Sequence, residues 1–279
     1  MGEFGVSDFF MFGSIPVWEK KTGIPMYDFP FRNIFSCRSI IDRVEQPVLL
    51  RIGAIRSYKE IASLLGKQGC NLLFTEQEHD RASQLENWYP LLIPYTPFSI
   101  VYSQFPSLEM VLQDFEFPIF VKGNRQTNRH NKKQSIIRNA DMFQTLANDW
   151  NKDTYLHWQK VVVREYIPLE VIDDSSYPDM IPFSYEFRIF FWKQQIVGYG
   201  KYWCLGRDYV LLEEEKEQAF GIAEKAARRV NVPFLTVDIA KTHRNEWIVI
   251  EVNDGQESGY AGVNPVTLWE NILNVERMK

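Results

Sequence analysis

Hydrophobic and polar positions alternate most clearly near the C-terminus, in residues 234–254. Apolar and β-branched side chains on either side of the polar run 242–245 predict two strands joined by a turn. If the turn is centred just after Arg244, Asp238 lies opposite Glu251 on one face of the hairpin. The pattern therefore predicts two facing carboxylates.

Opposed like charges destabilise a sheet unless something compensates for them. The oxygen ligands of Asp238, Glu251 and Asn253, which shares their face, are of the kind that suits Mg²⁺. A solvated acidic face at a sheet edge explains the pattern equally well. If a metal is the compensation, neutralising one carboxylate should leave the fold of the metal-free chain intact.

Further upstream, predicted strands alternate with predicted helices. The pattern indicates a strand over residues 48–53, a helix over 57–69, a strand over 71–75 and a helix over 76–93. This order is typical of a small parallel α/β unit. Residues 1–45 are aromatic-rich and interrupted by prolines, and we expect them to be irregular.

A short apolar strand over residues 118–122 ends at Lys122 and is followed by the polar, basic run 123–135. This run is either a loop that closes over phosphates, with Lys122 as a fixed charge beside it, or a solvated surface loop. A surface loop is the more common fate of a charge run. A helix over 140–150 and an apolar strand over 159–167 come next.

A second hairpin is predicted from residues 184–192 and 196–203. With a two-residue loop, Lys201 lies opposite Glu186 or Arg188, and all three side chains share one face. A three-residue loop moves Lys201 to the other face. A surface ion pair worth about 0–1 kcal/mol is the alternative explanation of these charges.

Composition narrows the class of protein. The chain is 45% hydrophobic and 24% charged, which is ordinary for a globular protein, and its formal charge of −5 lacks the basic bias of nucleic-acid binders. No apolar run approaches the roughly 20 residues of a membrane span, and the N-terminus lacks a basic secretory segment. Three distant cysteines without zinc-site spacing favour a reducing compartment, so we expect a cytoplasmic protein. The four histidines have no convincing partners.

Taken in order, the strands containing PIFVK, VREY and EFR and the paired acidic strands resemble the ATP-grasp superfamily of ATP-dependent carboxylate ligases. The resemblance covers roughly residues 75–265. It implies an α/β and α+β fold, in which two α+β lobes grip ATP and follow an N-terminal α/β domain. The implied domains are residues 1–95, 96–163 and 164–279.

The resemblance also implies ligands, ATP and Mg²⁺, and roles for individual residues. Nucleotide contacts are implied for Lys122, Glu165, Tyr166, Ile167, Glu186, Arg81 and Lys133. Contacts to the transferred phosphoryl group are implied for Arg188 and Lys201. Mg²⁺ ligation is implied for Asp238, Glu251 and Asn253.

Within the nucleotide set, Lys122 corresponds to the lysine that contacts phosphates and Glu186 to the ribose-binding residue, while Glu165–Ile167 is the hinge that receives adenine. Arg81 stands where most members have a second phosphate-binding lysine. Lys201 stands where many relatives have arginine, which resembles a subgroup defined by that exchange.

The basic run differs from the family pattern, because relatives usually carry several glycines there and this chain has only Gly123. It offers four cations instead, namely Arg125, Arg129, Lys132 and Lys133. The motifs VREY and EFR are also similar to the cell-division-cycle 123 family, an ATP-grasp-like group associated with assembly of a translation factor.

The leading function is therefore an ATP-dependent ligase that joins a carboxylate to an amine through an acylphosphate, with charge neutralisation and positioning as its catalytic means. One alternative is an ATP-dependent ligase of RNA ends, suggested by the basic run and nearby aromatic residues. Another is an ATP-binding factor that assembles a protein partner with little turnover. The acceptor substrate is not implied.

Overall fold

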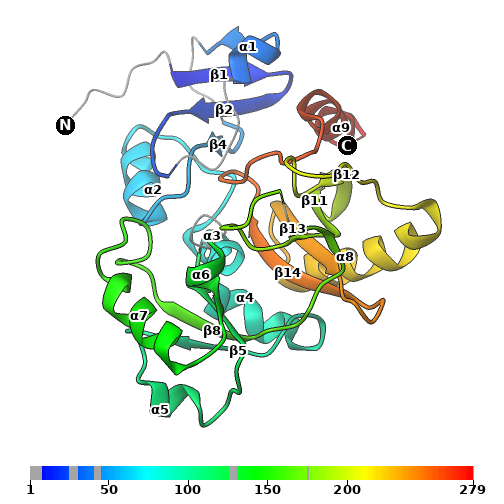
Figure 1. Ribbon diagram of the computed structural model, residues 1–279. Helices are drawn as coiled ribbons and strands as arrows, with labels where there is room; N and C mark the ends of the chain where they lie inside the picture. Colours follow the sequence, from blue (N-terminus) through cyan, green and yellow to red (C-terminus); the bar gives the residue numbers. More distant parts are fainter. Residues whose placement is uncertain (1–7, 25–30, 41–44, 126–130, 175, 279) are drawn as a thin grey trace.

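The computed structural model describes residues 8–24, 31–40, 45–125, 131–174 and 176–278. These residues form three four-stranded sheets and one two-stranded sheet, with helices packed around them. Figure 1 shows the N-terminal sheet at the top, a green lobe at the lower left and the C-terminal sheet at the right.

The N-terminal sheet has the order β3-β1-β2-β4, and only β2 and β4 are parallel. Its strands are β1 (Phe9–Phe12), β2 (Ile15–Glu19), β3 (Arg38–Ser39) and β4 (Leu49–Arg51). The expectation that residues 1–45 are irregular is therefore wrong for the part described. Gly13, at φ +57°, allows the tight turn between β1 and β2, so that their aromatic side chains reach the core.

Five helical segments accompany this sheet: α1 (Phe31–Ile34), α2 (Tyr58–Lys67), α3 (Glu76–Ser83), α4 (Leu85–Leu92) and the 3₁₀ turn η2 (Ile93–Tyr95). The single helix predicted over 76–93 is divided at Gln84, whose backbone is extended. The strand predicted over 71–75 is reduced to one bridge between Leu72 and Val48.

The lobe drawn in green, which we call the small lobe, contains a sheet of order β5-β8-β6-β7. Its elements are β5 (Ser99–Tyr102), α5 (Leu108–Val111), β6 (Ile119–Gly123), α6 (Lys132–Ser135), β7 (Ile136–Ile137), α7 (Ala140–Trp150) and β8 (Val161–Glu165). Along β6, Ile119 and Val121 enter the core of this lobe, so Phe120 and Lys122 face the other way.

The C-terminal sheet has the order β12-β11-β13-β14 and is antiparallel throughout. Its elements are β11 (Glu186–Trp192), β12 (Gln195–Lys201), η3 (Glu213–Glu215), α8 (Lys216–Val230), β13 (Phe234–Lys241), β14 (Trp247–Asp254) and α9 (Pro265–Arg277). A two-stranded sheet of β9 (Val171–Asp173) and β10 (Phe183–Ser184) precedes it.

The β13–β14 hairpin has the predicted register where it matters, because Asp238 lies opposite Glu251. Nearer the turn the register is one residue off the prediction, since Ile239 pairs with Val249 rather than Ile250. A β-bulge between these pairs adds a residue to β14 and restores the predicted pairing. The turn position was thus predicted slightly wrongly and the bulge cancels the error.

The β11–β12 hairpin has a two-residue turn, Lys193–Gln194, with positive φ at both residues. A bulge between Phe190 and Phe191 then shifts the register, so Lys201 lies opposite Phe187. The prediction that Lys201 opposes Glu186 or Arg188 is therefore wrong, and it shares the face of Phe187 instead.

Among the described residues, two hydrophobic cores form. One core is shared by the N-terminal and C-terminal sheets, and the other belongs to the small lobe alone. Helix α9 connects the first core across the chain, since the rings of Phe31 and Trp269 are 4.9 Å apart. The domain boundaries 1–95, 96–163 and 164–279 stay a prediction.

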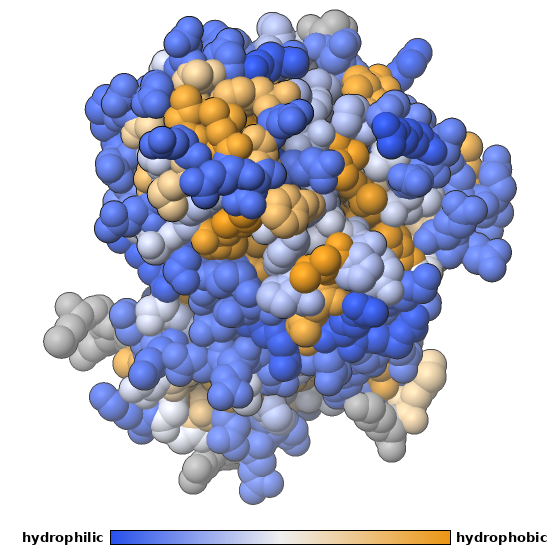
Figure 2. Space-filling view, turned by 90° about the horizontal axis from the view of Figure 1, so that it is seen from below, coloured by the Kyte–Doolittle hydropathy of each residue, from blue (hydrophilic) through white to orange (hydrophobic). Residues whose placement is uncertain are grey.

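On the face seen from below, apolar side chains form several separate patches among hydrophilic ones (Figure 2). Scattered apolar surface of this kind is normal for a folded chain. None of the helices within the described ranges combines the length and the apolar character that crossing a membrane requires.

Candidate active site

A cleft is lined by strands of both the small lobe and the C-terminal sheet. It contains roughly 1040 Å³ of unfilled space including its open mouth, at the upper end of the range for small-molecule sites. Its lining combines apolar side chains with a charged group. The charged members are Lys122, Arg164, Glu165, Glu186, Asp238 and Glu251.

The predicted hinge lies on this cleft. Glu165 ends β8, and the chain then passes through Tyr166 and Ile167 toward the C-terminal lobe. All three residues line the cleft, and the backbone amide of Glu165 donates to the Phe98 carbonyl at 2.9 Å. The apolar residues that follow, Pro168 and Leu169, extend the same wall.

Two buried cations stand on the small-lobe side. The Lys122 ammonium donates to a carboxylate oxygen of Glu251. Arg164 donates through Nε to Ser99 at 2.8 Å and through Nη1 to the Ile250 carbonyl at 2.7 Å. Its Nη2 is buried and finds no partner within the described part of the chain.

Burial governs the ionisation of these groups. It lowers the pKa of Lys122 and brings the pKa of Arg164 down to about 10, because a charged group loses its hydration inside the protein. Burial also opposes ionisation of Glu251, but Lys122 and Arg164 hold its pKa below the ordinary value. Sequence reasoning missed Arg164, although a charged residue inside the apolar strand VVVREY is a usable signal.

Arg188 and Asp238 form a second buried ion pair across β11 and β13. Arg188 donates to both carboxylate oxygens of Asp238, at 2.8 and 2.7 Å, and its third nitrogen donates to the Gly259 carbonyl at 2.9 Å. Each of the two opposed carboxylates therefore has its own cation. The prediction that neutralising one carboxylate leaves the metal-free fold intact does not fit this geometry, because it strands a buried arginine.

The three predicted metal ligands share one face of the hairpin, and the Asn253 side chain hydrogen-bonds to Glu251. Oxygen donors of this kind fit Mg²⁺. Because Arg188 and Lys122 already balance Asp238 and Glu251, the donor set fits a metal that arrives with an anion better than a free cation.

Glu186 is buried beside the Arg188–Asp238 pair and accepts a hydrogen bond from the Ser184 hydroxyl at 2.9 Å. Burial, and then the nearby charge of Asp238, raises the pKa of Glu186 to about 8. Tyr202, another residue that sequence reasoning missed, lines the cleft with its ring 5.1 Å from the Arg188 guanidinium carbon.

Three predicted site residues lie outside the cleft lining. Arg81 donates to the Asn231 carbonyl at 3.0 Å, at the end of α8. The Lys133 side chain is 81% exposed. Lys201 pairs with Asp208, on the face to which the bulge in the β11–β12 hairpin directs it. The geometry therefore gives no support to their predicted contacts.

The basic run 123–135 does not form one free loop. Arg125 is buried and donates to the Ile55 carbonyl and, at 2.9 Å, to Glu257. Lys132 begins the short helix α6, and Arg129 lies outside the described residues. The four cations therefore do not act as one exposed patch.

The statement that the histidines lack partners is wrong for His79. This residue is 1% exposed, its Nδ1 lies 2.9 Å from Asp254, and its ring stacks on Tyr58 at 4.3 Å. Asp254 is distant in the sequence, so no local pattern signals the contact. His130 lies outside the described residues.

Comparison with known proteins decides the family. A family model for an ATP-grasp domain, the third family of its clade, matches residues 113–272, more than half of the chain. The chain belongs to the ATP-grasp family. The predicted ATP-grasp fold and the resemblance on which it rested are thus confirmed.

Solved ATP-grasp structures have the same fold. D-alanine–D-alanine ligase from Bacillus anthracis complexed with ATP superposes with a TM-score of 0.56 and 16% identity, over 83% of this chain and 79% of that chain. A RimK-domain ATP-grasp protein from Sphaerobacter thermophilus gives a TM-score of 0.53 and 12% identity, over 82% and 80%. At such identities the likeness shows the fold alone.

C-terminally truncated Cdc123 from Schizosaccharomyces pombe also matches this ATP-grasp chain, with 16% identity over 66% of this chain and 87% of that chain. Its TM-score of 0.46 is too low to bear on function. No curated protein is significantly similar in sequence.

Proposed function

We propose that this ATP-grasp chain is an Mg²⁺-dependent ligase that uses ATP to join a carboxylate to an amine through an acylphosphate. One observation carries the proposal: Lys122, Arg164 and Arg188 gather around Asp238 and Glu251 at a single cleft. Buried cations beside paired carboxylates are suited to polyphosphate and its metal.

The remaining lining residues supply a place for the nucleoside. The proposal assigns adenine to the hinge Glu165–Ile167 and ribose to Glu186, both on the cleft. The B. anthracis ligase, which has the same fold, was crystallised with ATP. Lys201, Arg81 and Lys133 receive no role in this proposal.

In the proposed reaction a substrate carboxylate oxygen attacks the γ-phosphorus, the bond to the bridging oxygen breaks and ADP leaves. The amine nitrogen then attacks the acyl carbon, phosphate leaves and the nitrogen loses a proton. When bound, Mg²⁺ neutralises phosphate charge and polarises the phosphorus. The chain contributes preorganised charge and orientation.

Lys122 and Arg188 are the residues that change partners in this scheme. Without nucleotide they neutralise Glu251 and Asp238, and with nucleotide they donate to phosphate oxygens. Glu251, Asp238 and Asn253 then become ligands for Mg²⁺. We expect Mg²⁺ alone to bind weakly and to bind tightly together with ATP, because the triphosphate supplies the missing negative charge.

The acylphosphate is tested by trapping. The chain is incubated with ATP, Mg²⁺, a panel of carboxylic acids and hydroxylamine, which converts an acylphosphate into a stable hydroxamate. A hydroxamate that requires ATP, Mg²⁺ and one class of acid supports the ligase. ATP binding without any hydroxamate favours the assembly factor, and joining of RNA ends favours the RNA ligase.

The cytoplasm is the proposed location. Cys37, Cys70 and Cys204 are all free thiols, which is consistent with a reducing compartment.

A further inference from the structure

A second cavity adjoins the nucleotide cleft and shares Glu251 and Tyr202 with it. All three parts of the molecule contribute to its wall. The N-terminal part provides Ala54 and Ser83, and Arg125 follows β6 of the small lobe. The C-terminal lobe provides Arg188, Tyr202, Glu251, Asn253, Glu257, Ser258 and Gly259.

Two polar atoms of this wall have no hydrogen-bond partner among the described residues: the Ser83 hydroxyl and Nε of Arg125. Ser83 is only 4% exposed and Arg125 only 8%. Buried donors are rarely left unpaired, because the lost hydration costs free energy. Both atoms can donate to an anion, so the wall carries unused capacity to bind one.

The other charges of the wall are more fully engaged. Arg188 is bonded through all three nitrogens, and Glu251 is bonded to Lys122. Glu257 accepts from Arg125 at 2.9 Å through one oxygen, while its other oxygen lies 3.5 Å from the Ile55 amide and 3.6 Å from His79. The loosely held oxygen can accept from a ligand.

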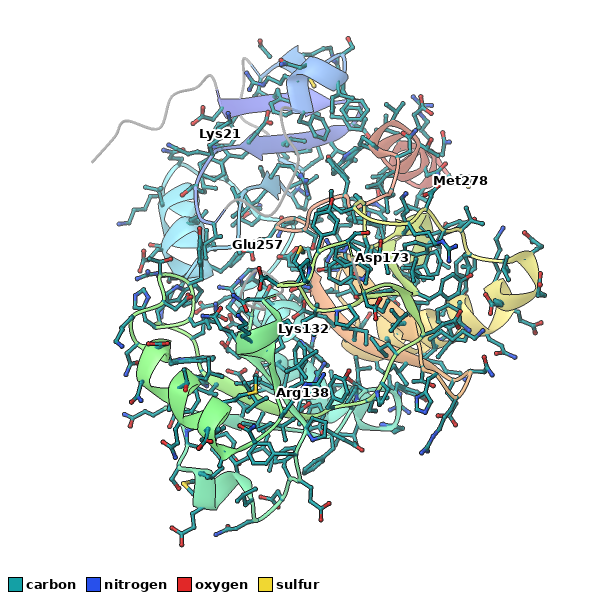
Figure 3. All side chains as sticks on the ribbon, viewed as in Figure 1. Lys21, Lys132, Arg138, Asp173, Glu257 and Met278 are labelled. Carbon is teal, nitrogen blue, oxygen red and sulfur yellow. The ribbon has the colours of Figure 1, made fainter. Side chains whose placement is uncertain are left out.

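A guanidinium and a carboxylate therefore stand side by side in one small polar cavity, and this pattern complements a ligand that carries both charges. Figure 3 places Glu257 near the centre of the molecule, between the N-terminal part, the small lobe and the C-terminal sheet. A ligand held there is surrounded by buried groups, since Ser83, Arg125 and Ser258 are all buried.

The position of the cavity agrees with the geometry of phosphoryl transfer. The attacking and leaving oxygens lie roughly in line through phosphorus, so the acceptor must sit beyond the phosphate end of the nucleotide. From the hinge, the lining runs through Lys122 and Glu251, and the second cavity begins at Glu251.

We propose that the second cavity is the acceptor site and that its substrate is a free α-amino acid, whose carboxylate is the group phosphorylated. The carboxylate binds Arg125 Nε and the Ser83 hydroxyl, and the ammonium binds Glu257. This inference rests on the proposed function and narrows the substrate to a small zwitterion.

The test is calorimetric binding to the full chain loaded with Mg²⁺ and a non-hydrolysable ATP analogue. The probes are the common amino acids in both enantiomers, and, for any that binds, its amide and its N-acetyl form. We expect both derivatives to bind at least about tenfold more weakly than the amino acid, since each loses a charge-assisted contact.

Ser83→Ala is the informative variant, because the Ser83 hydroxyl has no hydrogen bond within the described part of the chain whose loss could disturb the fold. It should weaken amino-acid binding about tenfold and leave the affinity for the ATP analogue unchanged. Ser135→Ala is the matched control, since the Ser135 hydroxyl is also buried and unpartnered among the described residues but lines neither cavity.

The outcomes separate the two proposals. Failure of the ATP analogue to bind overturns the proposed function and this inference with it. Binding of the analogue without any amino acid, equal binding of acid and amide, or a Ser83→Ala variant that behaves like the parent overturns this inference alone. Phosphate release stimulated only by peptides or RNA ends also overturns it.

Discussion

At the scale of single residues, the site depends on charges that are buried in pairs. Removing one member leaves the other without compensation in a poorly hydrated place. We therefore expect Asp238→Asn to lower the free energy of unfolding by about 3–5 kcal/mol, because Arg188 loses a bidentate partner. Guanidinium denaturation of the nucleotide-free chain measures this change.

The double variant Arg188→Met with Asp238→Leu is the control for that prediction. It removes both charges and should be clearly more stable than Asp238→Asn. A double variant that is less stable than the single one would mean that packing, not the stranded charge, determines the loss.

Glu186 connects the stability of the chain to pH. Its pKa is raised to about 8, so the folded chain keeps it protonated where the unfolded chain does not. Its contribution is fully present below pH ~4.5 and is lost as pH rises through 8, by up to about 5 kcal/mol.

Glu186→Gln cannot ionise, so relative to the parent it should gain stability between pH 5 and pH 8.5, with little difference at the acid end. Melting temperatures of both proteins across this range test the prediction. Glu214→Gln, at an exposed position, is the control and should follow the parent. Parallel curves for parent and Glu186→Gln would contradict the raised pKa.

Arg164 offers an unpartnered, buried donor to the nucleotide cleft, whereas Arg81 bonds to the end of α8 outside it. We expect Arg164→Gln to weaken MgATP binding at least about tenfold, since a charge-assisted hydrogen bond is lost. Arg81→Gln should bind like the parent. Titration of a fluorescent ATP analogue compares them, and equal losses would restore the phosphate role predicted for Arg81.

At the scale of elements, the hairpins show how far local pattern reaches. The alternation of apolar and polar residues was enough to place both hairpins and to bring Asp238 opposite Glu251. It was not enough to place Lys201, because a bulge adds one residue and reverses the face of everything beyond it. A bulge depends on packing against neighbouring strands, and that packing leaves no periodic signal along β12.

The turn Lys193–Gln194 is strained at both residues, whose φ values are 48° and 71°. Glycine tolerates such values, so Gln194→Gly should stabilise the chain by about 0.5–1 kcal/mol. Gln195→Gly, one residue further on, lies inside the β12 ladder opposite Trp192 and should destabilise it by a similar amount. Chemical denaturation of the pair gives the sign of each effect.

At the scale of the whole molecule, the family order of strands was recognisable in the sequence, and the contacts that join the parts were not. The buried network of Arg125, His79 and Glu257 draws one residue from each part of the fold. Each is unremarkable in its own segment, and only the tertiary arrangement brings their charges together. The second cavity was invisible for the same reason.

The two cores predict two cooperative units. Phe143→Ala should cost about 3–5 kcal/mol within the small lobe and raise amide hydrogen exchange there while the rest stays protected. Trp269→Ala should raise exchange in the N-terminal and C-terminal sheets together, because they share a core. Hydrogen exchange followed by mass spectrometry reads both, and exchange spread evenly over the chain after Phe143→Ala would refute the division.

The pairing of cations with carboxylates in the cleft also bears on kinetics. Three buried cations face two ionised carboxylates, so the field that reaches beyond the cleft mouth is weak. ATP therefore arrives at a rate close to that of an uncharged encounter, with little dependence on ionic strength. Discrimination between ATP and other anions falls on the exchange of ion pairs after arrival, and it appears in how long each anion stays rather than in how fast it comes.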